Sequence, residues 1–85
     1  QNEVVQLAKE NDLMIIVGSK KSANTTHLAD ISKEYTNTIH IETAQELNQY
    51  KEIIAKAEAI GVSAGASTPQ NVIDEVIEEI TGGKI

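Results

Sequence analysis

The chain has 85 residues, of which 40% are hydrophobic, and a formal net charge of -6. A chain of this length suggests one domain with a modest core. The acidic balance argues against a nucleic-acid partner, and no apolar stretch approaches the roughly 18 residues that a membrane span needs. Cysteine is absent, which excludes disulfides, a thiol nucleophile and cysteine-ligated zinc or iron–sulfur clusters within this chain. The expected location is cytoplasmic.

The first half of the chain alternates helical and strand patterns. Apolar residues recur at helical spacing in residues 1–11, which predicts a helix. The continuous apolar run 13–17 ends at Gly18 and is typical of a strand buried on both faces. A second amphipathic helix is predicted for residues 25–35, followed by a short strand at residues 38–41.

The next segment opens with a capping pattern. Thr43-Ala44-Gln45-Glu46 predicts a capping box, with Thr43 as the N-cap and Glu46 reaching back to it. A helical turn or two near the surface is expected at residues 53–57. The apolar run 59–63 then predicts the third strand.

The last element is an amphipathic helix. Pro69 suits its first position, with Ser67 or Thr68 as the cap, and Gly82-Gly83 is expected to stop it. The order of elements predicts an α/β fold: three layers, α/β/α, around a small parallel sheet of at least three strands in the order 2-1-3. We expect residues 1–85 to form a single α/β domain.

Two polar loops, at residues 17–26 and 61–69, each lie between a predicted strand and a predicted helix. The first helical turn has N–H groups without partners and carries the positive end of the dipole, so it attracts anions. Neither helix has an acid near its start, since the first acids are Asp30 and Asp74. Lys20 and Lys21 add positive charge nearby. These features suit an anion site, although Ser, Thr and Asn are also common N-caps, and the residues alone leave both interpretations open.

The predicted strand order brings the two polar loops together. Ligands of open α/β sheets bind beyond the carboxyl ends of the strands, where the strand order reverses. With the order 2-1-3, the reversal lies between the first and third strands, so both polar loops are expected at the crevice. Glu42 and the acidic cap that follows the second strand are expected off to one side.

Standard catalytic and metal motifs are missing from the sequence. It contains no GxGxxG, no GxxxxGK[ST] and no G-x-S-x-G pattern. His27 and His40 lack ligand-like spacing, so we interpret both as structural or solvated and expect no metal site. The chain has no convincing set of residues for nucleophilic catalysis.

The two loops resemble one family. Residues 17–25 read Val-Gly-Ser-Lys-Lys-Ser-Ala-Asn-Thr and are similar to the V-G-x-K-x-S-S-N-[ST] loop of the 4-hydroxy-3-methylbut-2-enyl diphosphate reductase family, also called IspH or LytB. Residues 60–69 read Ile-Gly-Val-Ser-Ala-Gly-Ala-Ser-Thr-Pro and are similar to its V-G-[VI]-[TS]-A-G-A-S-[TA]-P segment. The resemblance spans essentially the whole chain in the same order.

The resemblance implies a role in isoprenoid biosynthesis by the non-mevalonate pathway. The family reductively removes the hydroxyl of its diphosphate substrate and yields isopentenyl and dimethylallyl diphosphates. It uses a 4Fe-4S cluster held by three cysteines, surrounded by three similar α/β domains, of which this chain matches the C-terminal one. The implied partners are the diphosphate substrate, the rest of the reductase and an electron donor of the ferredoxin or flavodoxin type. We therefore expect this chain to be the C-terminal third of a longer reductase.

The resemblance also implies which residues bind the substrate. Family positions that bind the diphosphate correspond to Ser22, Ala23, Asn24 and Ser67. Ala23 departs from the family's second serine, which leaves only its backbone N–H as a donor. The cluster ligands and the catalytic residues lie outside this segment, so no catalytic or metal-binding residue is expected here, and the chain alone is expected to be inactive. The alternatives are a free-standing small-anion-binding module and a purely structural or interaction domain.

Overall fold

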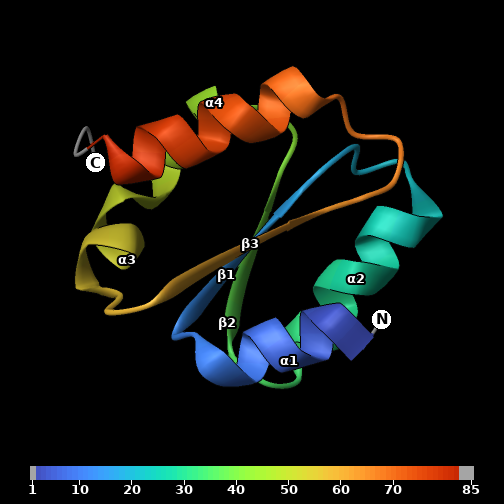
Figure 1. The fold of residues 1–85 in the computed structure, drawn as a ribbon, viewed down its shortest axis with the longest axis horizontal. Coiled ribbons are helices and arrows are strands. Elements are labelled where there is room, and N and C mark those ends of the chain that lie inside the picture. The colour runs from blue at the N-terminus through green and yellow to red at the C-terminus, as the bar shows by residue number, and fades with distance from the viewer. Residues whose placement is uncertain (1, 83–85) are drawn as a thin grey trace.

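A computed structural model describes residues 2–82 of the chain (Figure 1). Its centre is a parallel sheet of three strands, β1 (Leu13–Val17), β2 (Asn37–Ile41) and β3 (Ile60–Ala64). The strand order is β2-β1-β3, as predicted from the sequence. All five residues of β1 are buried because both of its edges are paired and both of its faces are covered.

The sheet register aligns the carboxyl ends of the three strands. Val17, the last residue of β1, lies opposite Ile41 of β2 and Ala64 of β3. The three loops that follow the strands therefore begin at the same edge of the sheet. Because β1 is central, its loop adjoins the loops of both neighbours.

One face of the sheet is covered by α1 (Asn2–Glu10) and α2 (Ala23–Lys33), which lie below the strands in Figure 1. Their apolar sides meet the even-numbered residues of β1, because successive side chains of a strand point to opposite faces. The buried cluster on this side consists of Val4, Ala8, Met14, Ile16 and Ala29.

The opposite face is covered by a 3-10 helix, η1 (Ala44–Tyr50), with α3 (Lys51–Lys56) and α4 (Gln70–Thr81). This side holds the larger cluster, formed by Leu13, Ile15, Val17, Ile39, Ile41, Ala44, Leu47, Ile54 and Val76. Helices on both faces of a parallel sheet make three layers, so the predicted α/β/α architecture is confirmed.

The element boundaries differ from the predictions mainly at the helix starts. The capping box is present, but it opens the 3-10 helix η1. The helix predicted from residue 25 begins at Ala23. The prediction that Pro69 is the first helical residue is wrong, because Pro69 is itself the N-cap of α4. Gly82 ends this helix as expected, and Gly83 lies outside the described residues.

The prediction that Ser67 or Thr68 caps α4 is also wrong, since no side chain caps this helix. The hydroxyl of Thr68 is directed elsewhere: Oγ1 donates to the carbonyl oxygen of Val17 at 3.0 Å. Thr68, in the loop between β3 and α4, is thus hydrogen-bonded to the end of the central strand β1. Cross-loop bonding has taken the hydroxyl that capping would have used.

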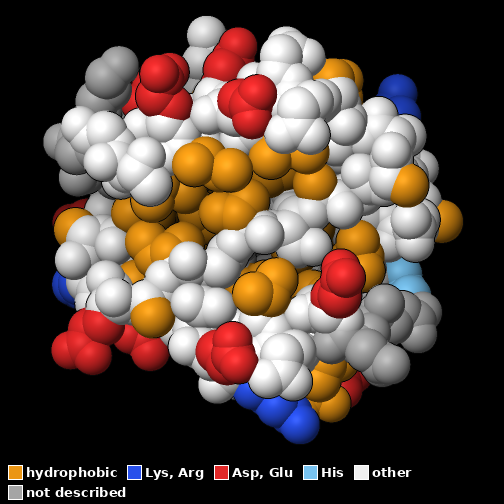
Figure 2. All heavy atoms as spheres, viewed as in Figure 1, with side chains coloured by type: hydrophobic (Ala, Val, Ile, Leu, Met, Phe, Trp, Pro, Cys, Tyr) orange, Lys and Arg blue, Asp and Glu red, His pale blue; other side chains and the backbone are white. Residues whose placement is uncertain are grey.

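An apolar area remains on the surface. Strand β3 is an edge strand whose residues are mostly half-buried, and Figure 2 shows hydrophobic side chains gathered between α4 and β3. Ile77 of α4 is 41% exposed.

Within residues 2–82, no helix is long and apolar enough to cross a membrane.

Candidate functional site

A groove of about 320 Å³ lies at the carboxyl edge of the sheet. It is lined by Gly18, Ser19, Glu42, Ser67, Thr68 and Pro69. All three loops that follow the strands contribute to it. It therefore occupies the place where ligands of open α/β sheets bind.

The loops after β1 and β3 diverge around this groove. The first leads into α2 on one face of the sheet, and the second leads into α4 on the other. Two hydrogen bonds to the carbonyl oxygen of Val17 join the loops, from Gly65 N at 3.1 Å and from Thr68 Oγ1 at 3.0 Å. The two polar loops therefore meet at the reversal of strand order, as the sequence predicted.

Thr25 fills the space between the loops. It is fully buried, and its side chain packs beneath both Gly18 and Gly65. Gly18 has φ +152°, a conformation that side chains rarely adopt, and a Cβ there would lie 2.8 Å from Thr25 Cγ2. The two glycines are therefore required for the loops to approach this buried threonine.

Ser22 caps α2. Its Oγ accepts hydrogen bonds from Thr25 N at 3.3 Å and from Thr25 Oγ1 at 3.2 Å. Ala23 and Asn24 follow as exposed residues of the first turn. Neither α2 nor α4 has an acidic residue in its first turn, as predicted. The first turn of α2 therefore carries no carboxylate of its own to offset the positive end of its dipole.

The four predicted binding residues do not all line one surface. Ser67 is exposed and lines the groove. Ser22, Ala23 and Asn24 lie on the first turn of α2, outside the lining of the groove. The connection between them runs through Thr25, which bonds Ser22 and packs against Gly65 of the loop that carries Ser67.

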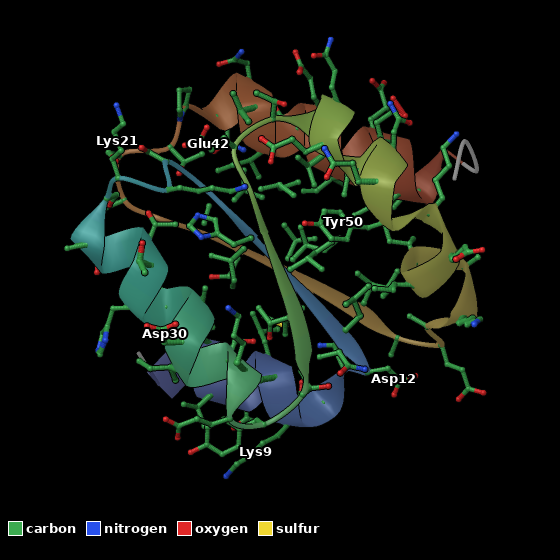
Figure 3. All side chains as sticks on the ribbon, turned by 180° about the vertical axis from the view of Figure 1, so that it is seen from behind. Lys9, Asp12, Lys21, Asp30, Glu42 and Tyr50 are labelled. Atoms are coloured by element: carbon green, nitrogen blue, oxygen red, sulfur yellow. The ribbon has the colours of Figure 1, made fainter. Side chains whose placement is uncertain are left out.

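The prediction that Glu42 lies off to one side is wrong. Glu42 lines the groove together with Ser67, and its Oε2 accepts a hydrogen bond from the backbone N–H of Lys20 at 2.7 Å. The cause is the central place of β1: the loop after it touches the end of β2 as closely as the end of β3. Figure 3 shows Glu42 at the same edge of the sheet as Lys21.

The two lysines offer an anionic ligand less than the sequence suggested. Lys20 Nζ lies 3.4 Å from Glu46 Oε1, so its charge is shared with a carboxylate. In Figure 3, Lys21 reaches outward from the tip of the loop. Two carboxylates, Glu42 and Glu46, thus accompany the two lysines at this edge, and the N-terminal dipole of α2 adds to its attraction for an anion.

Glu46 is held by several donors. Burial alone would raise the pKa of the Glu46 carboxyl. The backbone N–H groups of Glu42 and Thr43 and the ammonium of Lys20 lower this pKa by more than burial raises it. Glu46 Oε2 lies 2.8 Å from Glu42 N and 3.1 Å from Thr43 N. The net result is a pKa below the usual 4.5.

Acidification should therefore destabilise this corner of the fold. A carboxyl whose pKa is lower in the folded chain stabilises it above the unfolded pKa of 4.5 and loses that contribution as the pH falls through the folded pKa. We expect the free energy of unfolding to fall more steeply below pH 4.5 in the native chain than in Glu46→Gln. Urea unfolding at a series of pH values measures this difference, and equal slopes would contradict it.

The two histidines lie in different surroundings. His40 Nε2 lies 3.0 Å from the carbonyl oxygen of Gly18 and supports the first loop, while His27 is exposed on α2. Across the described part of the chain, no three His, Cys, Asp or Glu residues are placed to hold a metal ion.

Sequence reasoning missed two residues that organise the site, Thr25 and Thr68. Each is a threonine of a polar loop, and each was assigned at most a capping role. The signal that could have found Thr25 is the pair Gly18 and Gly65, which mark close backbone approach at the ends of two neighbouring strands. Sequence alone does not reveal what fills the space between them.

Comparisons with known proteins identify relatives that match nearly all of the chain. The family model described as LytB protein matches residues 1–81. The 4-hydroxy-3-methylbut-2-enyl diphosphate reductases of Alkaliphilus oremlandii and Geobacter sulfurreducens are 50% and 51% identical to the chain, covering 94% of it in each case. The chain spans 29% and 28% of those proteins.

A solved structure agrees with these relatives. A structure of (E)-4-hydroxy-3-methyl-but-2-enyl diphosphate reductase, described as the terminal enzyme of the non-mevalonate pathway, matches with a TM-score of 0.89 and 48% identity. The match covers 96% of this chain and 29% of that one. The family-model match over residues 1–81, together with this structural similarity, shows that the chain belongs to the LytB family.

Proposed function

We propose that this chain is the diphosphate-binding domain of an iron–sulfur reductase that converts 4-hydroxy-3-methylbut-2-enyl diphosphate to isopentenyl and dimethylallyl diphosphates. The observation that carries the proposal is the meeting of the two family-type loops at one edge of the sheet, joined through Val17 and Thr25. The relatives that match the chain are reductases whose name includes the diphosphate.

The proposed binding groups are three side chains and the backbone of α2. The hydroxyls of Ser22 and Ser67 and the amide of Asn24 donate to phosphate oxygens, while Ala23 offers only its backbone N–H. The acid-free first turn of α2 supports this role, because an anion near a helix N-terminus is stabilised by about 0.3–1 kcal/mol. Because the family loop that residues 17–25 resemble has a second serine at this position, Ala23 should weaken binding.

The 4Fe-4S cluster of the proposed reductase requires ligands from outside this chain. The sequence contains no cysteine, so its donor set does not fit such a cluster. When bound, the cluster supplies electrons to the substrate at a site formed elsewhere in the protein. The chain's own residues hold the diphosphate end of the substrate.

The apolar area between α4 and β3 fits contact with the rest of the reductase. Contiguous apolar surface on a soluble domain marks an interaction site, and the chain spans under a third of the relatives' length. The proposal also includes an electron donor of the ferredoxin or flavodoxin type and a cytoplasmic location, both of which follow from the family resemblance.

A titration with inorganic pyrophosphate tests the binding role. We expect pyrophosphate to shift the backbone amide NMR signals of Ser22, Asn24 and Ser67 in the isotopically labelled chain. High concentrations will be needed, because the chain supplies only part of the proposed pocket. The shifts should follow a saturable curve.

The matched control is Ser63→Ala, a serine inside β3 that lies in register with Ile16. This variant should show the same shifts, whereas Ser67→Ala should bind more weakly. Sodium chloride at equal ionic strength corrects for screening. Shifts confined to lysine side chains, or no shifts at all, would contradict a diphosphate site.

A further inference from the structure

Thr25 is the one buried hydroxyl that contacts both polar loops within residues 2–82. It is fully buried, it packs beneath Gly18 and Gly65, and its Oγ1 donates to Ser22 Oγ at 3.2 Å. Its backbone N–H donates to the same Ser22 oxygen at 3.3 Å. Ser22 Oγ therefore accepts two hydrogen bonds from a single residue.

The two bonds leave the Ser22 hydroxyl able to act toward a ligand only as a hydrogen-bond donor. A serine hydroxyl has two acceptor lone pairs and one proton to donate. Because Thr25 occupies both lone pairs, the only remaining capacity of this hydroxyl is to donate. A half-buried hydroxyl that can only donate matches an anion and does not match a ligand that offers donors.

Packing holds Thr25 in the conformation that makes this possible. Cβ atoms built at Gly18 and Gly65 would both collide with its side chain, so the two loops enclose it closely. Threonine also has restricted χ1 freedom because it is β-branched. Its hydroxyl is therefore preorganised toward Ser22 before any ligand arrives, which lowers the ordering cost of binding.

We propose that Thr25 is a positioning residue of the diphosphate site: its hydroxyl, together with its backbone N–H, fills both lone pairs of Ser22 Oγ and so directs the Ser22 proton to a phosphate oxygen. The inference rests on the proposed function. It goes beyond it by assigning a role in anion selectivity to a buried side chain that does not itself touch the ligand.

The test compares three substitutions in the complete reductase that carries this chain. Thr25→Val keeps the shape and removes the hydroxyl, while Thr25→Ser keeps the hydroxyl and removes the methyl. Thr38→Val is the matched control, because Thr38 forms a hydroxyl–hydroxyl pair with buried Ser32 at 2.6 Å, away from the groove. Calorimetry with inorganic pyrophosphate, substrate kinetics and Tm are measured for each.

We expect Thr25→Val to weaken pyrophosphate binding about five- to tenfold and to raise KM similarly, with little change in kcat, because the diphosphate is not the reacting group. Thr25→Ser should retain wild-type affinity. Thr38→Val should lower Tm without changing affinity. A purely structural Thr25 would instead make Thr25→Val and Thr38→Val indistinguishable in binding.

The outcomes distinguish the proposed function from the role of Thr25. Failure of the wild-type protein to bind pyrophosphate would overturn the proposed function, and the role of Thr25 with it. Wild-type binding together with unchanged affinity in Thr25→Val would overturn the role of Thr25 alone. If Thr25→Val does not fold, Thr25→Ser still decides, since weakened binding in a variant that keeps the hydroxyl would contradict the proposal.

Discussion

Gly65→Ala should destabilise the chain by about 3 kcal/mol, at the upper end of the usual cost of overpacking. A Cβ at position 65 would collide with Oγ1 of Thr25 and lie 3.3 Å from Thr25 Cβ. Thr25 is fully buried and cannot turn away, so the loop after β3 must shift. Because domains of this size are stable by only about 5–10 kcal/mol, chemical denaturation will detect the loss easily.

Gly61→Ala is the matched control for this substitution. A Cβ there would lie 2.6 Å from Met14 Sδ and 2.8 Å from Asn11 Nδ2. These atoms belong to flexible side chains that can move at less cost. The Gly65 variant should therefore be the less stable of the two, and adding Thr25→Ala to it should recover stability. Equal losses, or no recovery, would show that Thr25 does not set the spacing of the loops.

The strands and layers could be predicted because local pattern and packing agree. The run Leu13–Val17 contains no polar residue, and a strand that is apolar on both sides needs helices on both faces. The remaining helices and strands follow in an order that right-handed crossovers convert into one sheet. For these elements, the composition of each segment was sufficient.

The helix starts could not be predicted as well, because tertiary contacts compete for the capping side chains. Thr68 looks like a cap for α4, yet its hydroxyl bonds Val17 across the groove. Pro69 suits the first position of a helix by its fixed φ, but here it is the N-cap. Local helix-start preferences identified the residues near the start of α4, but they did not predict which groups those residues contact.

The site was predicted in outline only. The meeting of the two loops follows from the strand order, whereas the place of Glu42 in the groove depends on how closely the loop after β1 approaches the end of β2. The loop bonds this carboxylate through Lys20 N. Such a contact over 22 residues of chain carries no signal in the sequence.

Removing the hydroxyls of Ser22 and Ser67 together should lower kcat/KM of the complete reductase by about a hundredfold or more. A hydrogen bond to a charged group contributes roughly 1.5–3 kcal/mol, and two such bonds to a diphosphate lie within one binding step. Most of the effect should be in KM, because the diphosphate is held and not transformed. Ser22→Ala also removes the cap of α2, so Tm must be measured alongside.

Steady-state kinetics of that double variant is the most direct measurement of the central claim that these two loops hold the substrate diphosphate. We expect the double variant to fold and its KM to rise by about a hundredfold. The KM should be unchanged in Ser63→Ala and lower in Ala23→Ser, which restores the missing hydroxyl. A double variant that folds and keeps the wild-type KM would contradict the claim.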